Sequence, residues 1–245
     1  MKYKIIDTET GKRVDDVGEK EKNDIKKKDS VKRVVEKGIE KGDESSPMDP
    51  PEAYDIKYAI TDVDLESMSD SLKSLIDEHK DVISKLENFE ASLIAFKAEG
   101  FRMTKEINDS FAAFFSFFDN DILVHNRKEE RHLFPILHKR LIESGEHSKE
   151  EIPKTSVDLM EDDHVKFIQL ASLTFNILGL AVRLPDKHSQ MLTYDVAYNT
   201  GIEFVELLKL HIYREDNILF PLAQKLLTKA EFIKIEEKMT FLNEG

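Results

Sequence analysis

Apolar residues recur along most of the chain at steps of three and four, which is the period of an amphipathic α-helix. The first such stretch lies between residues 65 and 97 and contains Leu72, Leu75, Ile76, Ile83, Leu86, Phe89, Leu93 and Phe96. Further stretches follow the same period, and none shows the strict alternation of a β-strand over a useful length. The pattern therefore predicts an all-α protein.

Glycines and capping residues divide this pattern into long helices with short connections. We expect helices over residues 65–97, 104–144, 149–182 and 189–227, followed by a short C-terminal helix that begins near Thr228. Thr104 is a candidate N-cap, Gly100 and Gly145 are candidate stops, and Ser148 with Glu151 is a candidate capping box. Because the connections are short, we predict an antiparallel four-helix bundle.

The first part of the chain has dense mixed charge and few aromatic residues. Residues 1–50 carry 13 basic and 13 acidic side chains and run into the Pro/Ser/Asp-rich stretch GDESSPMDPPE. Such a composition is typical of a mobile tail. We predict a charged, flexible segment over residues 1–55 and the helical domain over residues 56–245. A short helix over residues 31–39, which would dock a protein partner, is the alternative for the tail.

Charge and composition exclude several classes of function. The net charge of −13 resides entirely in residues 51–245, so that part should repel nucleic acid. The absence of Cys excludes disulfides, zinc–thiolate sites and a Cys nucleophile. The N-terminus lacks the apolar region of a signal peptide, and the longest apolar runs are shorter than the ~20 residues that span a bilayer. We therefore predict a cytoplasmic protein without membrane contact.

An internal repeat carries the candidate chemistry. The segment HNRKEERHLFPILHKRL begins at His125, and HIYREDNILFPLAQKLL begins at His211. Both contain His and Glu four residues apart, followed by Leu-Phe-Pro. A lone His in an acidic setting precedes each segment, His79 by 46 residues and His164 by 47 residues. The helical part of the chain therefore consists of two similar halves.

The spacing within each half suggests a metal site. Residues four apart lie on one face of an α-helix, so His125 with Glu129, and His211 with Glu215, can each converge on one point. His79 and His164 would each add an imidazole from another helix. Four imidazoles and two bridging carboxylates suit two metal ions and leave positions open for a small ligand, a combination that favours non-haem iron, although manganese and zinc accept the same ligands. Glu130 and Asp216 should lie off the metal face and point to solvent.

These motifs resemble the hemerythrin-like family, also called the HHE cation-binding domain. The resemblance covers residues 65–227 and is most specific in HNRKEERHLFP and HIYREDNILFP, each with its upstream His. It implies a four-helix bundle with a non-haem di-iron site that binds oxygen, nitric oxide or a related oxidant. It also implies a ligand set, with Glu129 and Glu215 as bridges and His79, His125, His164 and His211 as terminal ligands.

The chain departs from parts of the family pattern. The oxygen carriers have a further His four residues after the third helix's ligand, where this chain has Ile168. The iron–sulfur repair proteins have a Cys-containing module and an additional His between the first two helices, and this chain has neither. His132 shares the face of His125, and three roles stay open for it: a fifth His ligand, a hydrogen-bond donor to a ligand, or a buried histidine without a metal role.

Three functions are compatible with such a site. The first is binding of a small gaseous or oxidant ligand for sensing, storage or stress response. The second is catalysis or iron donation in oxidative or nitrosative stress, by turnover of peroxide or nitric oxide or by iron–sulfur cluster repair. The third is an iron-homeostasis sensor that folds around its metal. We rank binding first, because no substrate pocket, proton relay or Cys is evident in the sequence.

Overall fold

The computed structural model describes residues 67–149 and 151–242, and all of them belong to one compact unit. Every regular element in these ranges is helical, and they contain no β-strand, which confirms the all-α class. The predicted flexible segment 1–55, its alternative helix 31–39 and the predicted start of the helical domain at residue 56 lie outside the described residues.

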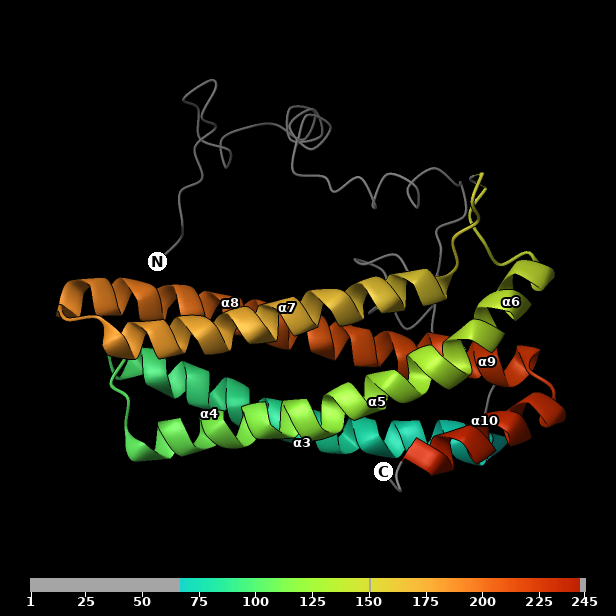
Figure 1. Ribbon diagram of the computed structural model, residues 1–245, viewed down its shortest axis with the longest axis horizontal. Coiled ribbons are helices and arrows are strands. Elements are labelled where there is room, and N and C mark those ends of the chain that lie inside the picture. Colours follow the sequence, from blue (N-terminus) through green and yellow to red (C-terminus); the bar gives the residue numbers. More distant parts are fainter. Residues whose placement is uncertain (1–66, 150, 243–245) are drawn as a thin grey trace, which may run out of the picture. The chain divides into compact units, whose positions relative to one another are not determined.

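The helices follow the order that the apolar pattern predicts. They are α3 (Asp70–Ala98), α4 (Lys105–Phe117), η4 (Phe118–Ile122), α5 (Leu123–Lys128), η5 (Glu129–Leu133), α6 (Phe134–Ser144), α7 (Ser156–Arg183), α8 (Lys187–Arg214), η6 (Glu215–Leu219), α9 (Phe220–Leu226) and α10 (Lys229–Leu242). They lie lengthwise beside one another (Figure 1), with α3 packed against α4 and α8, and α7 packed against α8 and α6. The short helix α10 covers α3 and η5.

The ends of the helices confirm some of the predicted caps and correct one. Thr104 accepts a hydrogen bond from the N–H of Ile107 at 3.3 Å, as an N-cap does, and Gly145 ends α6 with φ of +87°. The capping box expected at Ser148 is wrong, because α7 begins later, with Thr155 as its N-cap and Asp158 completing the box. Pro153 explains the difference, since the residue before a proline is disfavoured in a helix.

Two π-helical turns occupy equivalent places in the two halves. In η5 the N–H of Phe134 donates to the carbonyl of Glu129, and in η6 the N–H of Phe220 donates to the carbonyl of Glu215. Each turn stands just before a proline, Pro135 or Pro221, which has no N–H to continue the α-helical ladder. In both halves the helix therefore accommodates the proline with a π-turn that begins at the Glu of the HxxxE motif.

The core consists of two apolar clusters separated by a polar layer. The first core cluster is built around Phe89, Phe114 and Phe204, and the second core cluster is built around Leu72 and Leu137. Between them, each of the long helices contributes buried His or Glu side chains, namely His79, His125, Glu129, His164, His211 and Glu215. Because two apolar clusters enclose this layer, its polar groups have little access to water.

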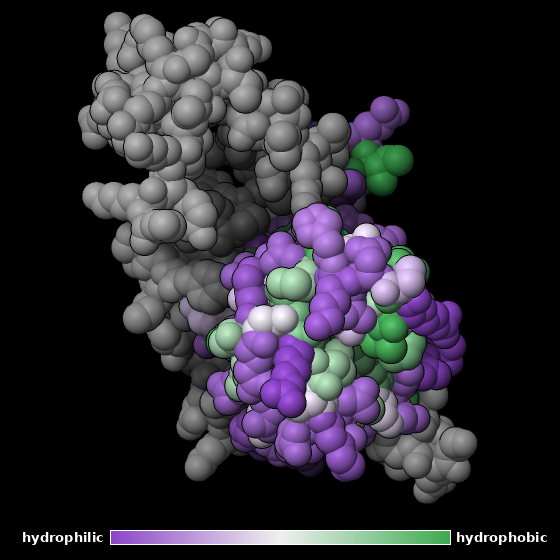
Figure 2. Space-filling model, turned by 90° about the vertical axis from the view of Figure 1, so that its left-hand side faces the viewer, coloured by the Kyte–Doolittle hydropathy of each residue, from purple (hydrophilic) through white to green (hydrophobic). Residues whose placement is uncertain are grey.

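The surface of α7 is unusually apolar. Its exposed side chains include Val165, Phe175 and Leu180, each more than half exposed at 56 %, 58 % and 54 %. Within the described residues, α7 is the one helix whose length and apolar composition would allow it to cross a membrane. The core helix of a soluble protein can have the same length and composition. At the end of the unit where α7 gives way to α8, apolar side chains lie among mostly hydrophilic ones (Figure 2). The predicted cytoplasmic location stays a prediction.

A capping box of Thr228 and Glu231 stands at the start of α10, the short C-terminal helix that the sequence predicts. Glu231 Oε2 accepts hydrogen bonds from the N–H and the hydroxyl of Thr228, each at 2.8 Å, and Arg140 of α6 donates to Oε1. Although desolvation raises the pKa of Glu231, these donors lower it from 4.5 to about 2. The ionised carboxylate therefore links α10 to α6.

The low pKa of Glu231 predicts a pH-dependent contribution to stability. A depressed folded-state pKa stabilises the fold above the ordinary value of 4.5, and the contribution is lost as the pH falls toward 2. Glu231→Gln should lower the melting temperature at pH 7, and the difference from wild type should shrink at pH 3. Glu237→Gln, on the exposed face of α10, is the matched control. Equal differences at both pH values would contradict the expectation.

Candidate metal centre

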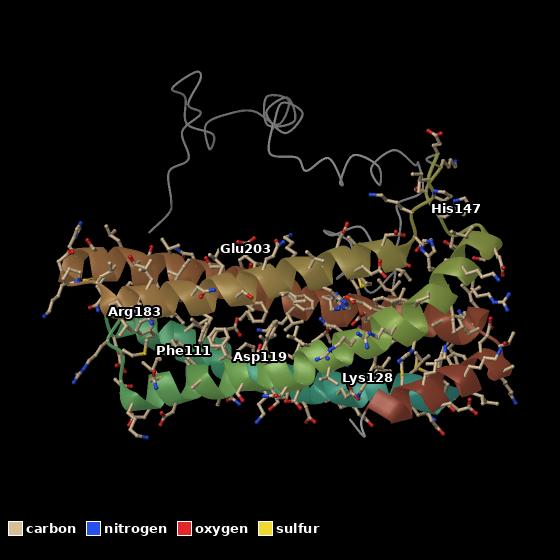
Figure 3. The ribbon with its side chains drawn as sticks, in the orientation of Figure 1. Phe111, Asp119, Lys128, His147, Arg183 and Glu203 are labelled. Carbon is tan, nitrogen blue, oxygen red and sulfur yellow. The ribbon has the colours of Figure 1, made fainter. Side chains whose placement is uncertain are left out.

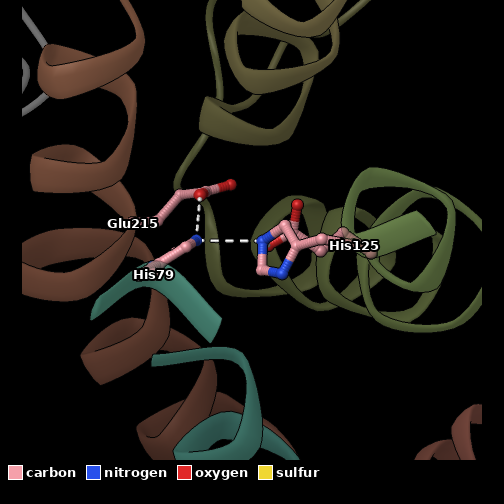
Figure 4. A group of neighbouring side chains, drawn as sticks. His79, His125 and Glu215 are labelled. Atoms are coloured by element: carbon pink, nitrogen blue, oxygen red, sulfur yellow. Dashed lines mark hydrogen bonds and ion pairs between the residues drawn. The ribbon is translucent and has the colours of Figure 1, made fainter. Parts of the chain in front are cut away.

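The six predicted ligands come together at one place in the core. Their side-chain atoms form two overlapping groups, in each of which the ligand atoms lie within 4.8 Å of one another. One group is His79, His125, Glu129 and Glu215, and the other is Glu129, His164, His211 and Glu215. Figure 4 shows part of the first group, with His79 from α3, His125 from α5 and Glu215 from η6. Each group could hold a metal ion.

The distances between ligand atoms suit a common cation. The Nε2 atoms of His79 and His125 are 2.9 Å apart, and those of His164 and His211 are 3.1 Å apart. The distances from these nitrogens to the nearest glutamate oxygens are 3.2–3.4 Å. Bonds of about 2.1 Å that meet at right angles on one ion separate their ligand atoms by about 3 Å. The spacing is therefore that of neighbouring ligands around a metal.

Both glutamates belong to both groups, but they reach them differently. Glu129 places Oε1 at 3.4 Å from His125 and Oε2 at 3.4 Å from His164, so each oxygen faces one group. Glu215 places a single oxygen, Oε2, at 3.3 Å from His79 and 3.2 Å from His211. The carboxylates thus lie between the two groups, in the place of bridging ligands.

The electrostatics of the cluster require a positive charge. Glu129 and Glu215 are fully buried, and their oxygens have no hydrogen-bond donor in the part of the chain that the structure describes. Although desolvation raises the pKa of Glu215, His211 and His79 hold it well below its ordinary value. Conversely, desolvation lowers the pKa of His79, but Asp216 and Glu215 raise it to about 10. Either protons or a metal ion must balance these carboxylates.

Outer carboxylates fix which imidazole nitrogen faces the centre. Asp216 accepts a hydrogen bond from Nδ1 of His79 at 2.7 Å, and Glu130 accepts one from Nδ1 of His164 at 2.8 Å. An ionised carboxylate only accepts, so Nδ1 carries the hydrogen and the Nε2 lone pair of a neutral ring points inward. The expectation that Glu130 and Asp216 point to solvent holds for Glu130, which is exposed, but Asp216 is half-buried, and both also contact an imidazole of a neighbouring helix.

Four further charged residues take part that the predicted ligand set omits. Glu78 accepts hydrogen bonds from His125 Nδ1 at 2.8 Å and from Lys128 at 2.7 Å. Arg214 donates to Asp163 at 2.9 Å, and both of these side chains are buried. The sequence contains a signal for these four residues. An acidic residue stands directly before each lone His, and a basic residue stands directly before the Glu of each HxxxE motif.

Aromatic rings cover the imidazoles on the side of the second core cluster. Phe220 stacks on His79 with ring centroids 5.6 Å apart, and Phe134 stacks on His164 at 5.7 Å. These are the Phe residues of the two Leu-Phe-Pro motifs, so both motifs pack beside the centre. Phe167 lies on the opposite side and contacts both His164 and His211, at 5.4 Å and 5.3 Å.

His132 is not part of either group. Burial and the charge of Lys238 in α10 lower its pKa, and its ring nitrogens have no hydrogen-bond partner among the described residues. His147 lies in the connection between α6 and α7, away from the centre (Figure 3). Of the three roles left open for His132, a ligand role finds no support, and the residue is a partly buried histidine outside both His/Glu groups.

Comparison with known proteins adds no family to this picture. No protein-family model matches the chain, and no curated protein matches it. The resemblance to the hemerythrin-like family therefore stays a prediction from the repeated motifs.

Glu129 provides a direct test of the centre, because it belongs to both groups. Glu129→Gln keeps the shape of the side chain but removes the charge that balances a cation. We expect metal binding to weaken by more than the roughly 10–100-fold that loss of an outer partner costs. Elemental analysis and equilibrium metal titration measure this. Glu87→Gln, the same change at an exposed position of α3, should bind as wild type does. Unchanged metal content in Glu129→Gln would refute a ligand role.

Proposed function

We propose that this protein is a non-haem di-iron protein that binds oxygen, nitric oxide or a related small ligand for sensing, storage or stress response. Its architecture would be that of a hemerythrin-like antiparallel four-helix bundle. The observation that carries the proposal is the pair of overlapping His/Glu groups, which share two fully buried carboxylates. A cytoplasmic location, the absence of nucleic-acid and membrane contacts, and a protein partner for residues 1–55 belong to the same proposal.

The ligand chemistry supports iron. Each group offers two imidazoles and two carboxylates and no thiolate, a mixture that non-haem iron accepts readily and that manganese and zinc also accept. A six-coordinate ion with four protein ligands keeps two positions for other ligands. When bound, an iron pair would supply reversible redox chemistry and an affinity for small oxidants.

The residues around the centre would hold the ligands in place and keep water away. Asp216 and Glu130 orient His79 and His164, and the rings of Phe134 and Phe220 cover the same imidazoles. On the other side, Ile83 and Ile168 are partly buried and pack against the first core cluster. Ile83 follows His79 by four residues, and Ile168 follows His164 by four residues. Apolar surroundings of this kind slow the loss of a bound species to water.

Binding is favoured over catalysis by the state of the nearby acids. The carboxylates closest to the imidazoles, among them Asp216, Glu130 and Glu78, are already engaged as hydrogen-bond acceptors of the imidazoles themselves. The two surface hollows between α3 and α4, of about 350 and 590 Å³, are lined by none of the six candidate ligands. The second hypothesis, turnover of peroxide or nitric oxide, therefore ranks below binding.

Spectroscopy of the iron-loaded protein tests the proposed binding. We expect charge-transfer absorption of a coupled ferric pair under air. The absorption should change when azide, nitric oxide or oxygen is added to protein in the redox state that binds the ligand. The reason is that Glu129 and Glu215 belong to both His/Glu groups, so two bound ions would be coupled through these carboxylates and would keep positions for a further ligand. Glu87→Gln should give the wild-type spectrum, and Glu129→Ala should lose it.

The outcome also ranks binding against catalysis. Absence of the coupled spectrum, or a spectrum that no small ligand changes, would refute gas binding. Turnover of peroxide or nitric oxide far above that of Glu129→Ala would rank the catalytic hypothesis above binding.

Iron-dependent folding is a second candidate, supported by two buried carboxylates that contact imidazoles but have no hydrogen-bond donor among the described residues. Burying Glu129 and Glu215 without hydrogen-bond donors is costly, and a cation removes the cost. Metal ligation would then contribute directly to folding stability, as an iron-homeostasis sensor requires.

Melting curves measure this coupling. At a free ferrous concentration of about 100 times Kd, binding adds ~2.7 kcal/mol, which corresponds to about 5–10 °C at the usual 2–4 °C per kcal/mol. We therefore expect chelation to lower the melting temperature of the wild type and to leave Glu129→Ala unchanged. A metal-independent melting temperature of the wild type would contradict the sensor role.

A further inference from the structure

The two halves of the centre support their imidazoles unequally. Three of the four imidazoles donate through Nδ1 to a carboxylate at 2.7–2.8 Å, namely His79, His125 and His164. For the fourth, His211, the carboxylate oxygen nearest to Nδ1 is Oδ2 of Asp163, at 3.8 Å. That distance is too long for a hydrogen bond, and Nδ1 of His211 has no hydrogen-bond partner among the described residues.

The lengths of the two outer acids explain the difference. In the first half, Glu78 uses one oxygen for His125, at 2.8 Å, and the other for Lys128, at 2.7 Å. In the second half, Asp163 stands in the equivalent place but is one methylene shorter. Its Oδ2 lies 2.9 Å from Arg214 and therefore stays 3.8 Å from His211.

A carboxylate on the outer nitrogen strengthens an imidazole as a metal ligand. It fixes the orientation of the ring and raises the basicity of the inner nitrogen, and its loss typically costs about 10–100-fold in metal affinity. His211 is positioned instead by the edge-on contact with Phe167 at 5.3 Å, which provides no such charge. Its support is therefore weaker than that of His125.

We propose that the two ion positions differ in affinity, and that the position of His164 and His211 holds the weaker, exchangeable ion. This inference rests on the proposed metal centre. Asp163 is the positioning residue that sets the difference, because its short side chain is held by Arg214 instead of reaching His211. The position of His79 and His125, where both imidazoles are held by carboxylates, fills first and empties last.

Titration of the metal-free protein with Co²⁺, whose visible absorption reports its ligands, tests the inequality. The wild type should bind in two steps that differ by about 10–100-fold. Asp163→Glu lengthens the acid to match the first half, so the two steps should move together. Glu78→Asp shortens the other acid, so the tighter step should weaken. Both variants keep every charge, and helix content by circular dichroism confirms that each is folded.

Two further variants assign the steps to positions. His211→Ala should abolish the weaker step and leave the tighter one, and His125→Ala should do the reverse. Two equal steps in the wild type, or an unchanged separation in Asp163→Glu, would overturn the inequality while leaving the centre intact. Failure of the wild type to bind Co²⁺ at all would instead refute the metal centre and the inference with it.

Discussion

The structure depends on two carboxylates that are fully buried and lack hydrogen-bond donors among the described residues, Glu129 and Glu215. Burial of an unpaired carboxylate would destabilise the fold by several kcal/mol. The surrounding residues form successive layers of opposite charge, which offset this cost. Imidazoles contact the inner carboxylates, outer acids contact the imidazoles, and buried Lys128 and Arg214 contact two of the outer acids. A cation held by the two His/Glu groups would complete this sequence of layers.

The helices and the two HxxxE pairs could be predicted because the relevant information is local, whereas the approach of His79 and His164 is inferred from the internal repeat. The i, i+4 spacing places His125 beside Glu129 whatever surrounds the helix, and the second copy repeats the arrangement. The outer acids could not be placed in the same way. Asp216 lies about 100° from Glu215 on its helix, a direction that points to solvent on an isolated helix but to His79 of α3 here. The directions in which helices cross are not readable from one helix alone.

The two halves share a backbone plan but differ in side chains. Both have a π-turn after HxxxE and a proline after the turn, so the strongest constraint acts on the placement of Glu129 and Glu215. In contrast, Glu78 corresponds to Asp163, and Lys128 corresponds to Arg214. The charge of the side chain is the same at these positions in both halves, but its length differs. Two similar half-sites can therefore have different properties.

The rings that cover the imidazoles have a consequence for the order of assembly. His79 of the first half lies under Phe220 of the second half, and His164 of the second half lies under Phe134 of the first. Neither half can therefore enclose its own histidine. Both His/Glu groups also include Glu215, so neither group is complete until the last long helix has docked against the rest of the chain.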